Sequence, residues 1–102
     1  MNRERTYTLS LEGDLGAFDA ARVEALFPPA ADYTRVVVDC KAVTSMDSSI
    51  VAALMRFRQS FVLAGREPLN MVIIAPARLR RIFELTGLSR FVTVIYPQSH
   101  VI

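Results

Sequence analysis

The stretch VVVDCKAVTSMDSSIVAALMRF, residues 36–57, contains the pattern that decides the fold. The β-branched run over residues 35–39 predicts a central strand that is buried on both faces of a sheet. Apolar residues then recur at helical spacing from residue 48 to about residue 64, which predicts an amphipathic helix whose apolar stripe faces the sheet. That stripe consists of Ile50, Val51, Leu54, Phe57 and Phe61. A strand, a short loop and a helix therefore form the centre of the predicted domain.

The same periodicities predict the elements on either side of this unit. Further strands are expected over residues 6–11, 69–75 and 91–96, and a turn over residues 13–16. One further helix is expected over residues 20–27 with Asp19 as its cap, and another begins near Pro76 and ends at Gly87. The order β-α-β-α-β-α-β predicts an α/β fold with a mostly parallel central sheet flanked by helices. We expect a single domain over residues 1–102, of which 97–102 form a tail.

The composition is that of one small globular domain. The chain has 102 residues, of which 52% are hydrophobic, and this supports a core and argues against disorder. The formal net charge of +2, from 12 basic and 10 acidic residues, is too balanced for a nucleic-acid binder. The polar start predicts no signal peptide, and no apolar run reaches the roughly 20 residues of a membrane-spanning helix. We therefore expect a cytoplasmic protein without membrane insertion.

Residues that build catalytic and metal sites are scarce in this chain. Cys40 is the only cysteine and His100 the only histidine, so an intrachain disulfide, a zinc site and a Ser-His-Asp triad cannot be assembled. The glycines within residues 13–16 match neither a phosphate-binding loop nor a dinucleotide fingerprint. We expect no metal, no cofactor and no catalytic residue, and hence a protein that is not an enzyme.

Asp47, Ser48 and Ser49 at the start of the central helix allow two interpretations. Asp47 is a good N-cap, because its carboxylate can accept a hydrogen bond from the first turn. A phosphate on Ser48 would be favoured by the helix dipole, and its charge of about −1.5 to −2 would bring repulsion and a desolvation cost into a partner interface. Helical spacing also predicts a small, partly apolar face beside the serines that suits docking. This far side of the helix carries Ser49, Ala52, Arg56, Gln59, Ser60 and Leu63.

Three segments of the chain together resemble one known family. The longest, VVVDCKAVTSMDSSIVAAL, is similar to a strand, loop, Asp-Ser-Ser and helix found in the STAS domain. The segment APARLRRIFELTGLSRFVTV is similar to that family's C-terminal helix, TGL turn and final strand. Leu11-Glu12-Gly13-Asp14-Leu15 looks like its early Leu-x-Gly-Glu-Leu segment. The resemblance covers nearly the whole chain, and within the STAS domains it points to the bacterial anti-sigma factor antagonists.

The resemblance implies a switch protein that catalyses nothing. In such antagonists the serine after the motif's aspartate, which corresponds to Ser48, is phosphorylated by a partner that is both anti-sigma factor and serine kinase. The unphosphorylated antagonist binds this partner and frees a sigma factor, and a serine phosphatase reverses the phosphorylation. We expect Ser48 to be the phosphorylation site and the protein to be a monomer or weak dimer. The expected partner-binding residues are Asp47, Ser48, Ser49, Ile50, Ala52, Arg56 and Gln59.

Two glycines that the family usually carries after the serines are replaced here by Ile50 and Ala52. Because glycine permits close approach of another backbone, the side chain of Ile50 is expected to restrict access of a kinase. This departure keeps open a second hypothesis, an interaction module with the same fold but no phosphoswitch. Such a module could be a scaffold subunit of a signalling complex or the cytosolic subunit of a lipid transporter. A third hypothesis, an enzyme, would need convergent polar groups that the sequence does not show.

Overall fold

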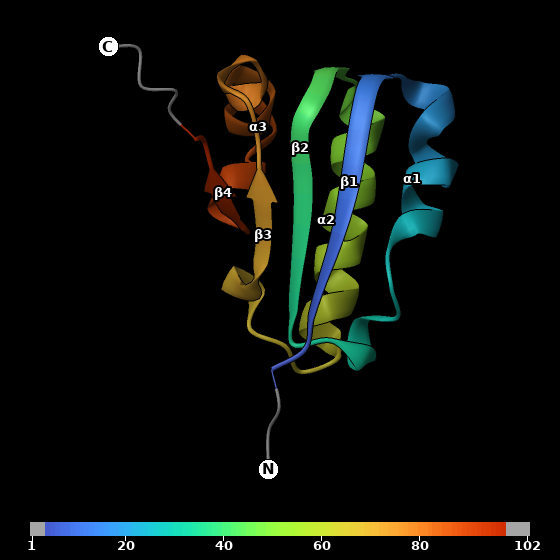
Figure 1. Ribbon diagram of the computed structural model, residues 1–102, viewed down its shortest axis with the longest axis vertical. Coiled ribbons are helices and arrows are strands. Elements are labelled where there is room, and N and C mark those ends of the chain that lie inside the picture. The colour runs from blue at the N-terminus through green and yellow to red at the C-terminus, as the bar shows by residue number, and fades with distance from the viewer. Residues whose placement is uncertain (1–3, 98–102) are drawn as a thin grey trace.

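Within residues 4–97, which the computed structural model describes, four strands form one sheet. They are β1 (Thr6–Leu15), β2 (Arg35–Met46), β3 (Met71–Ile74) and β4 (Thr93–Ile95). Neighbouring strands pair in parallel in the order β1-β2-β3-β4 (Figure 1). Successive strands are connected by the helices α1 (Ala20–Leu26), α2 (Ser48–Leu63) and α3 (Arg80–Thr86). The predicted α/β fold with a parallel sheet flanked by helices is confirmed.

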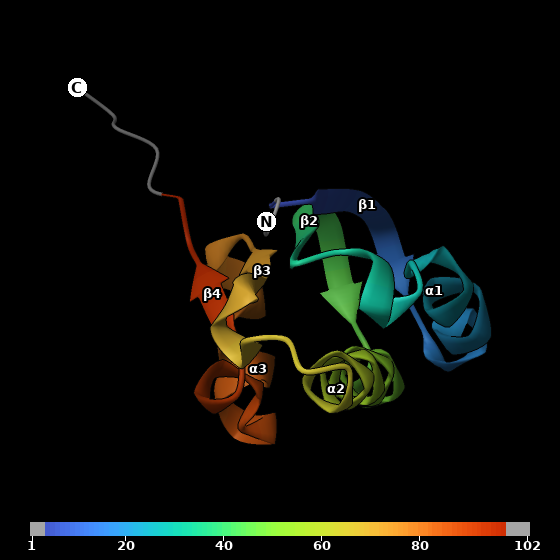
Figure 2. The same cartoon turned by 90° about the horizontal axis from the view of Figure 1, so that it is seen from below.

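The three helices lie on one side of the sheet, and no helix of the described chain covers the other side (Figure 2). Consecutive strands are neighbours, and crossovers between parallel strands share one hand, so each connecting helix returns over the same face. Val36 and Val38 of β2 are fully buried beneath the helices, whereas Val37 and Asp39, which point the other way, are only half-buried. The prediction that this strand is buried on both faces is therefore wrong, because its neighbours and crossovers leave one face uncovered.

The helix-free face is built from positions that pair across all four strands. Its residues form two rows, Thr8, Val37, Val72 and Thr93 in one and Ser10, Asp39, Ile74 and Ile95 in the other. The hydroxyls of Thr8 and Ser10 lie on β1, and the ion pair between Asp39 and Lys41 (N···O 3.8 Å) lies on the neighbouring β2. Aliphatic side chains lie towards β4. The face is thus mainly polar towards β1 and, apart from Thr93, aliphatic towards β4.

The central helix α2 matches its predicted extent to within one residue. All members of the predicted apolar stripe are buried against the sheet and α1. Phe57 stacks on Phe27, with ring centroids 4.4 Å apart, and this contact joins α2 to the end of α1. The helix α3 ends at Gly87, whose φ of +78° lies in the left-handed region that glycine adopts without strain. The predicted stop at this glycine is confirmed.

The first two strands are longer than the sequence predicts. The turn expected over residues 13–16 is part of β1, which continues to Leu15. Gly13, with φ of +79°, lies where the pairing with β2 changes register, which is the signature of a bulge. The loop expected before Asp47 likewise belongs to β2. Gly13 therefore adopts its left-handed conformation within a bulge, and both strands continue past it.

The last two strands are shorter than predicted. Residues 69–70 belong to the 3₁₀ turn Pro68–Asn70 rather than to β3. Phe91 follows the 3₁₀ turn Leu88–Arg90 with helical backbone angles, so β4 begins only at Thr93. His100 and the rest of the tail after residue 97 lie outside the described residues.

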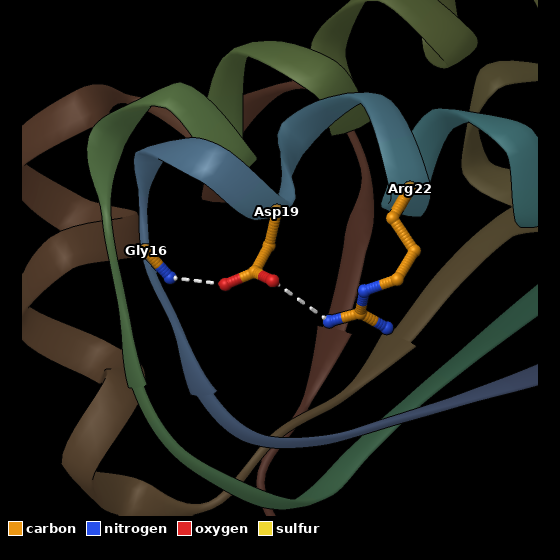
Figure 3. Close-up of polar contacts among 3 residues, drawn as sticks. All are labelled: Gly16, Asp19 and Arg22. Carbon is orange, nitrogen blue, oxygen red and sulfur yellow. Dashed lines mark hydrogen bonds and ion pairs between the residues drawn. The ribbon is translucent and has the colours of Figure 1, made fainter.

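Asp19 does not cap α1 in the predicted way. Its carboxylate accepts hydrogen bonds from the backbone N–H of Gly16 (2.9 Å) and from the guanidinium of Arg22 (3.1 Å), as Figure 3 shows. These two contacts lower the pKa of the Asp19 carboxyl, the Gly16 bond contributing most. Because the backbone of Asp19 is already helical, its side chain reaches back to the start of the 3₁₀ turn Ala17–Asp19 instead of forward into α1.

Candidate functional site

The start of α2 is held in place by the ends of β1 and β2. Asp47 follows β2 directly and donates its backbone N–H to the carbonyl of Leu15 at the end of β1 (2.8 Å). Just before this point on both strands, the hydroxyl of Ser45 donates a hydrogen bond to the carboxylate of Asp14. The sheet therefore fixes the position of the first turn of α2, which begins at the edge where all three helices start (Figure 1).

Asp47 is the N-cap of α2, which confirms the capping prediction. Its Oδ2 accepts hydrogen bonds from the backbone N–H of Ser49 (2.9 Å) and from the hydroxyl of Ser49 (2.6 Å). Both bonds favour the charged carboxylate, the hydroxyl bond more strongly, and they lower the pKa of the Asp47 carboxyl. The negative charge also faces the positive end of the helix dipole. Asp47 is thus an ionised anchor at neutral pH.

The two serines of the motif have different surroundings. Ser48 is exposed, and its hydroxyl makes no hydrogen bond with residues 4–97. Ser49 is half-buried, and its hydroxyl is already bound to Asp47. Ideal helical spacing puts Ser49 on the far side of the helix and Ser48 on a flank. The observed order of exposure is the reverse, because the carboxylate of Asp47 draws the Ser49 side chain back towards the cap.

Ile50 belongs to the core and not to the exposed surface. Its side chain is fully buried, with 0% of its surface exposed, on the same stripe as Leu54 and Phe57. We therefore remove Ile50 from the predicted contact residues. The size of Ile50 was also expected to restrict access of a kinase to the serines. This expectation is wrong, because the side chain is buried in the protein and does not cover the outer surface of the serines.

The outer face of α2 presents the remaining predicted contact residues. Ala52, Arg56 and Gln59 are all exposed there. The guanidinium of Arg56 forms an ion pair with Glu24 of α1, so this arginine is bound to its neighbouring helix. The side chain of Leu63 at the far end of the face is 80% exposed. This face therefore combines small, charged and polar side chains, and one large apolar side chain lies at its end.

Two surface features near this face carry no signal in the sequence. The side chain of Phe18 is fully exposed, on the 3₁₀ turn that packs against α2. A groove of about 350 Å³ lies between the end of α1 and α2, next to the pair of Glu24 and Arg56. Phe18 would be noticed only once the position of its turn is known, since a phenylalanine in a sequence is normally assigned to the core.

Other chemistry has little support among the described residues. Burial raises the pKa of the Cys40 thiol to about 12, which leaves it protonated and unreactive at neutral pH. Across residues 4–97 no three His, Cys, Asp or Glu side chains gather in a way that would hold a metal ion. No helix in the same range is both long and apolar enough to cross a membrane.

The sheet order, the crossover helices and the Asp-Ser-Ser cap after the second strand define a STAS domain. The chain belongs to the family described as "Mlab, STAS domain", whose model matches residues 2–95. Members of this class are generally binding modules without catalytic activity. A comparison with curated protein sequences found no match.

Solved structures with the same fold include two STAS domains of different settings. One is the anti-sigma factor antagonist SpoIIAA in its unphosphorylated form, with a TM-score of 0.65 and 14% identity, covering 96% of this chain and 86% of that one. The other is the STAS domain of a SulP transporter from Vibrio cholerae, with a TM-score of 0.60 and 21% identity, covering 94% of this chain and 77% of that one. Both likenesses establish the fold.

Proposed function

We propose that this protein is a cytoplasmic anti-sigma factor antagonist that is switched off by phosphorylation at Ser48. It binds an anti-sigma factor that is also a serine kinase, and this binding frees a sigma factor. A serine phosphatase returns the protein to its binding form. The contact surface comprises Asp47, Ser48, Ser49, Ala52, Arg56 and Gln59, and the protein acts as a monomer or weak dimer.

The observation that carries the proposal is the exposed hydroxyl of Ser48, which no residue within 4–97 binds, beside the hydroxyl of Ser49, which is bound to Asp47. A kinase needs an accessible hydroxyl, and of the two serines only Ser48 offers one without giving up a hydrogen bond to Asp47. The likeness to SpoIIAA supports the same function, since its structure has the same fold. A phosphate on Ser48 would add about −1.5 to −2 charges next to Asp47, so a partner surface that fits the free hydroxyl would meet repulsion and desolvation cost.

The test combines the protein with its candidate kinase and ATP, and follows intact mass. We expect the mass of one phosphate on the wild type and on Ser49→Ala, and none on Ser48→Ala. The Ser49→Ala variant is the matched control, because it removes the neighbouring hydroxyl but keeps the backbone bond to Asp47. Ser48→Asp should weaken kinase binding about tenfold or more, as expected when an unpaired charge enters an interface. A phosphate found on Ser49, or undiminished binding by Ser48→Asp, would refute the proposal.

A second candidate function is an interaction module that attaches to a membrane transporter without a phosphoswitch. The transporter origin of one of the two similar STAS structures favours it. Affinity purification of the tagged protein distinguishes the two functions. Recovery of a transporter ATPase, equally well with Ser48→Ala and Ser48→Asp, would support the module. Loss of the recovered partner with Ser48→Asp alone would support the switch.

A further inference from the structure

A second groove lies between the end of β2 and α3, close to the start of α2. Its volume is about 400 Å³. Met46 and Leu79 form a buried floor, Ile82 is half-buried, and Leu85 stands at the edge with 74% of its side chain exposed. Leu85 is exposed above an apolar floor. Grooves that bind an apolar side chain of a protein partner have this arrangement.

The rim of this groove is positively charged. Arg78 donates from Nε to the carbonyl of Val43 (2.9 Å) and from a terminal nitrogen to the carbonyl of Lys41 (3.2 Å), so its charge is fixed beside the end of β2. Arg81 is exposed and forms no ion pair or hydrogen bond with the side chains of residues 4–97. Its charge is therefore available to a ligand.

The groove itself is lined by basic and uncharged residues. No acidic residue lines it. Acidic groups lie outside the lining: the hydroxyl of Ser45 is bound to the carboxylate of Asp14, and Asp47 directly follows Met46. Glu84 lines an adjoining hollow with Arg80 and Arg81. Two arginines at the rim and no lining carboxylate make the groove complementary to an acidic ligand.

We infer that this groove docks an acidic amphipathic segment of the protein partner, with an apolar side chain over Met46 and Leu85 and a carboxylate at Arg81. The inference rests on the proposed function of binding a protein, and it extends the contact surface beyond α2. Ser48 follows Met46 by two residues, which places their Cα atoms within about 7 Å of each other. Ser48 and the groove are therefore close enough for one partner surface to contact both.

The test needs no knowledge of the natural partner. A synthetic amphipathic peptide, with leucines at helical spacing and glutamates at its other positions, is titrated into ¹⁵N-labelled protein and followed by NMR. A twin peptide with glutamine in place of every glutamate is the matched ligand control. We expect saturable shifts at residues 44–46 and 78–85 with the acidic peptide, and several-fold weaker binding of the twin.

Charge-reversal variants test whether the acidic peptide binds at this groove. Arg81→Glu should weaken acidic-peptide binding several-fold, whereas Arg90→Glu, which reverses an exposed arginine on the neighbouring 3₁₀ turn, should leave it unchanged. The NMR spectra themselves report whether each variant is folded. Equal binding of the two peptides, absence of shifts at the groove, or indifference to Arg81→Glu would each overturn the inference.

A membrane surface is the alternative ligand, and phosphatidylglycerol vesicles test it. Line broadening at the groove with vesicles, without binding of the acidic peptide, would overturn the inference in favour of an anionic lipid site. Since neither titration contains a kinase, their failure is independent of the phosphorylation assay at Ser48. If Ser48 is phosphorylated but the peptide does not bind, the proposed function is retained and only the inference about the groove is rejected.

Discussion

The carboxylate of Asp47 holds the hydroxyl of Ser49 at 2.6 Å, and this contact gives two adjacent serines different roles. Ser49 belongs to the helix cap through both its backbone N–H and its hydroxyl. Ser48 is left exposed, and its hydroxyl has no hydrogen-bond partner in the described part of the chain. Capping, which the structure shows, and phosphorylation, which we propose, therefore fall on different residues and are compatible.

Replacing the cap should destabilise the protein measurably. Asp47→Ala removes the acceptor of two hydrogen bonds at the start of α2, so we expect the melting temperature to fall by several degrees. Asp47→Ser keeps an acceptor oxygen and should recover most of the loss. Thermal unfolding followed by circular dichroism compares the three proteins. An unchanged melting temperature in Asp47→Ala would show that the strand contacts alone hold the helix start.

The cap should also weaken in acid. The folded-state pKa of Asp47 lies below its ordinary value of 3.8, so its ionised form stabilises the fold above that pH, and this contribution is lost as the pH falls through the lowered pKa. Asp47→Asn keeps the cap geometry without the charge. The difference in urea midpoint between the wild type and Asp47→Asn should be constant at neutral pH and disappear in strong acid. A difference that does not depend on pH would contradict this account.

Ile50 should behave as a core residue in mutagenesis. Ile50→Ala should lower the free energy of unfolding by about 2–5 kcal/mol, since it leaves a cavity in the core. Ala52→Ser, two positions on and exposed, should change it by no more than about 0.5 kcal/mol. Urea denaturation measures both values.

The binding assay provides the second half of this prediction. Ile50→Val, which should cost only about 0.5–1.5 kcal/mol, keeps the protein folded and should bind the partner as the wild type does. If Ile50→Val is fully folded but binds the partner more weakly, Ile50 is a contact residue after all.

The single cysteine within the fold should report unfolding. Burial raises the pKa of the Cys40 thiol to about 12 and shields it from reagents. At mildly alkaline pH we expect no modification of the native protein by a maleimide and rapid modification in urea. The labelled fraction should follow the unfolding curve measured by circular dichroism. Fast labelling under native conditions would show that β2 opens locally.

The sequence predicts α2 and its cap well, because every signal for them is local. The apolar stripe, Asp47 at the cap and Ser48 in the first turn lie within a few positions of one another. Gly87 is equally well predicted, since a glycine after a helical pattern has one common use. Such elements depend on neighbours along the chain, which a sequence displays directly.

The misjudged features depend on neighbours across the sheet. Whether Val37 is buried is decided by the strand order and by the hand of the crossovers, which no residue near it encodes. Gly13 allows a left-handed backbone in a turn or in a bulge, and only the pairing of β1 with β2 selects the bulge. These features required the tertiary arrangement.

The one-sided arrangement of helices gives the protein a front and a back, which is useful for attaching it to a surface. Thr8 is exposed on the helix-free face of β1, opposite the layer that contains α2. The natural thiol of Cys40 is buried within the described fold, so a Thr8→Cys variant offers a thiol that reacts first. Coupling through that position would immobilise every molecule in the same orientation, with the outer face of α2 turned towards the solution.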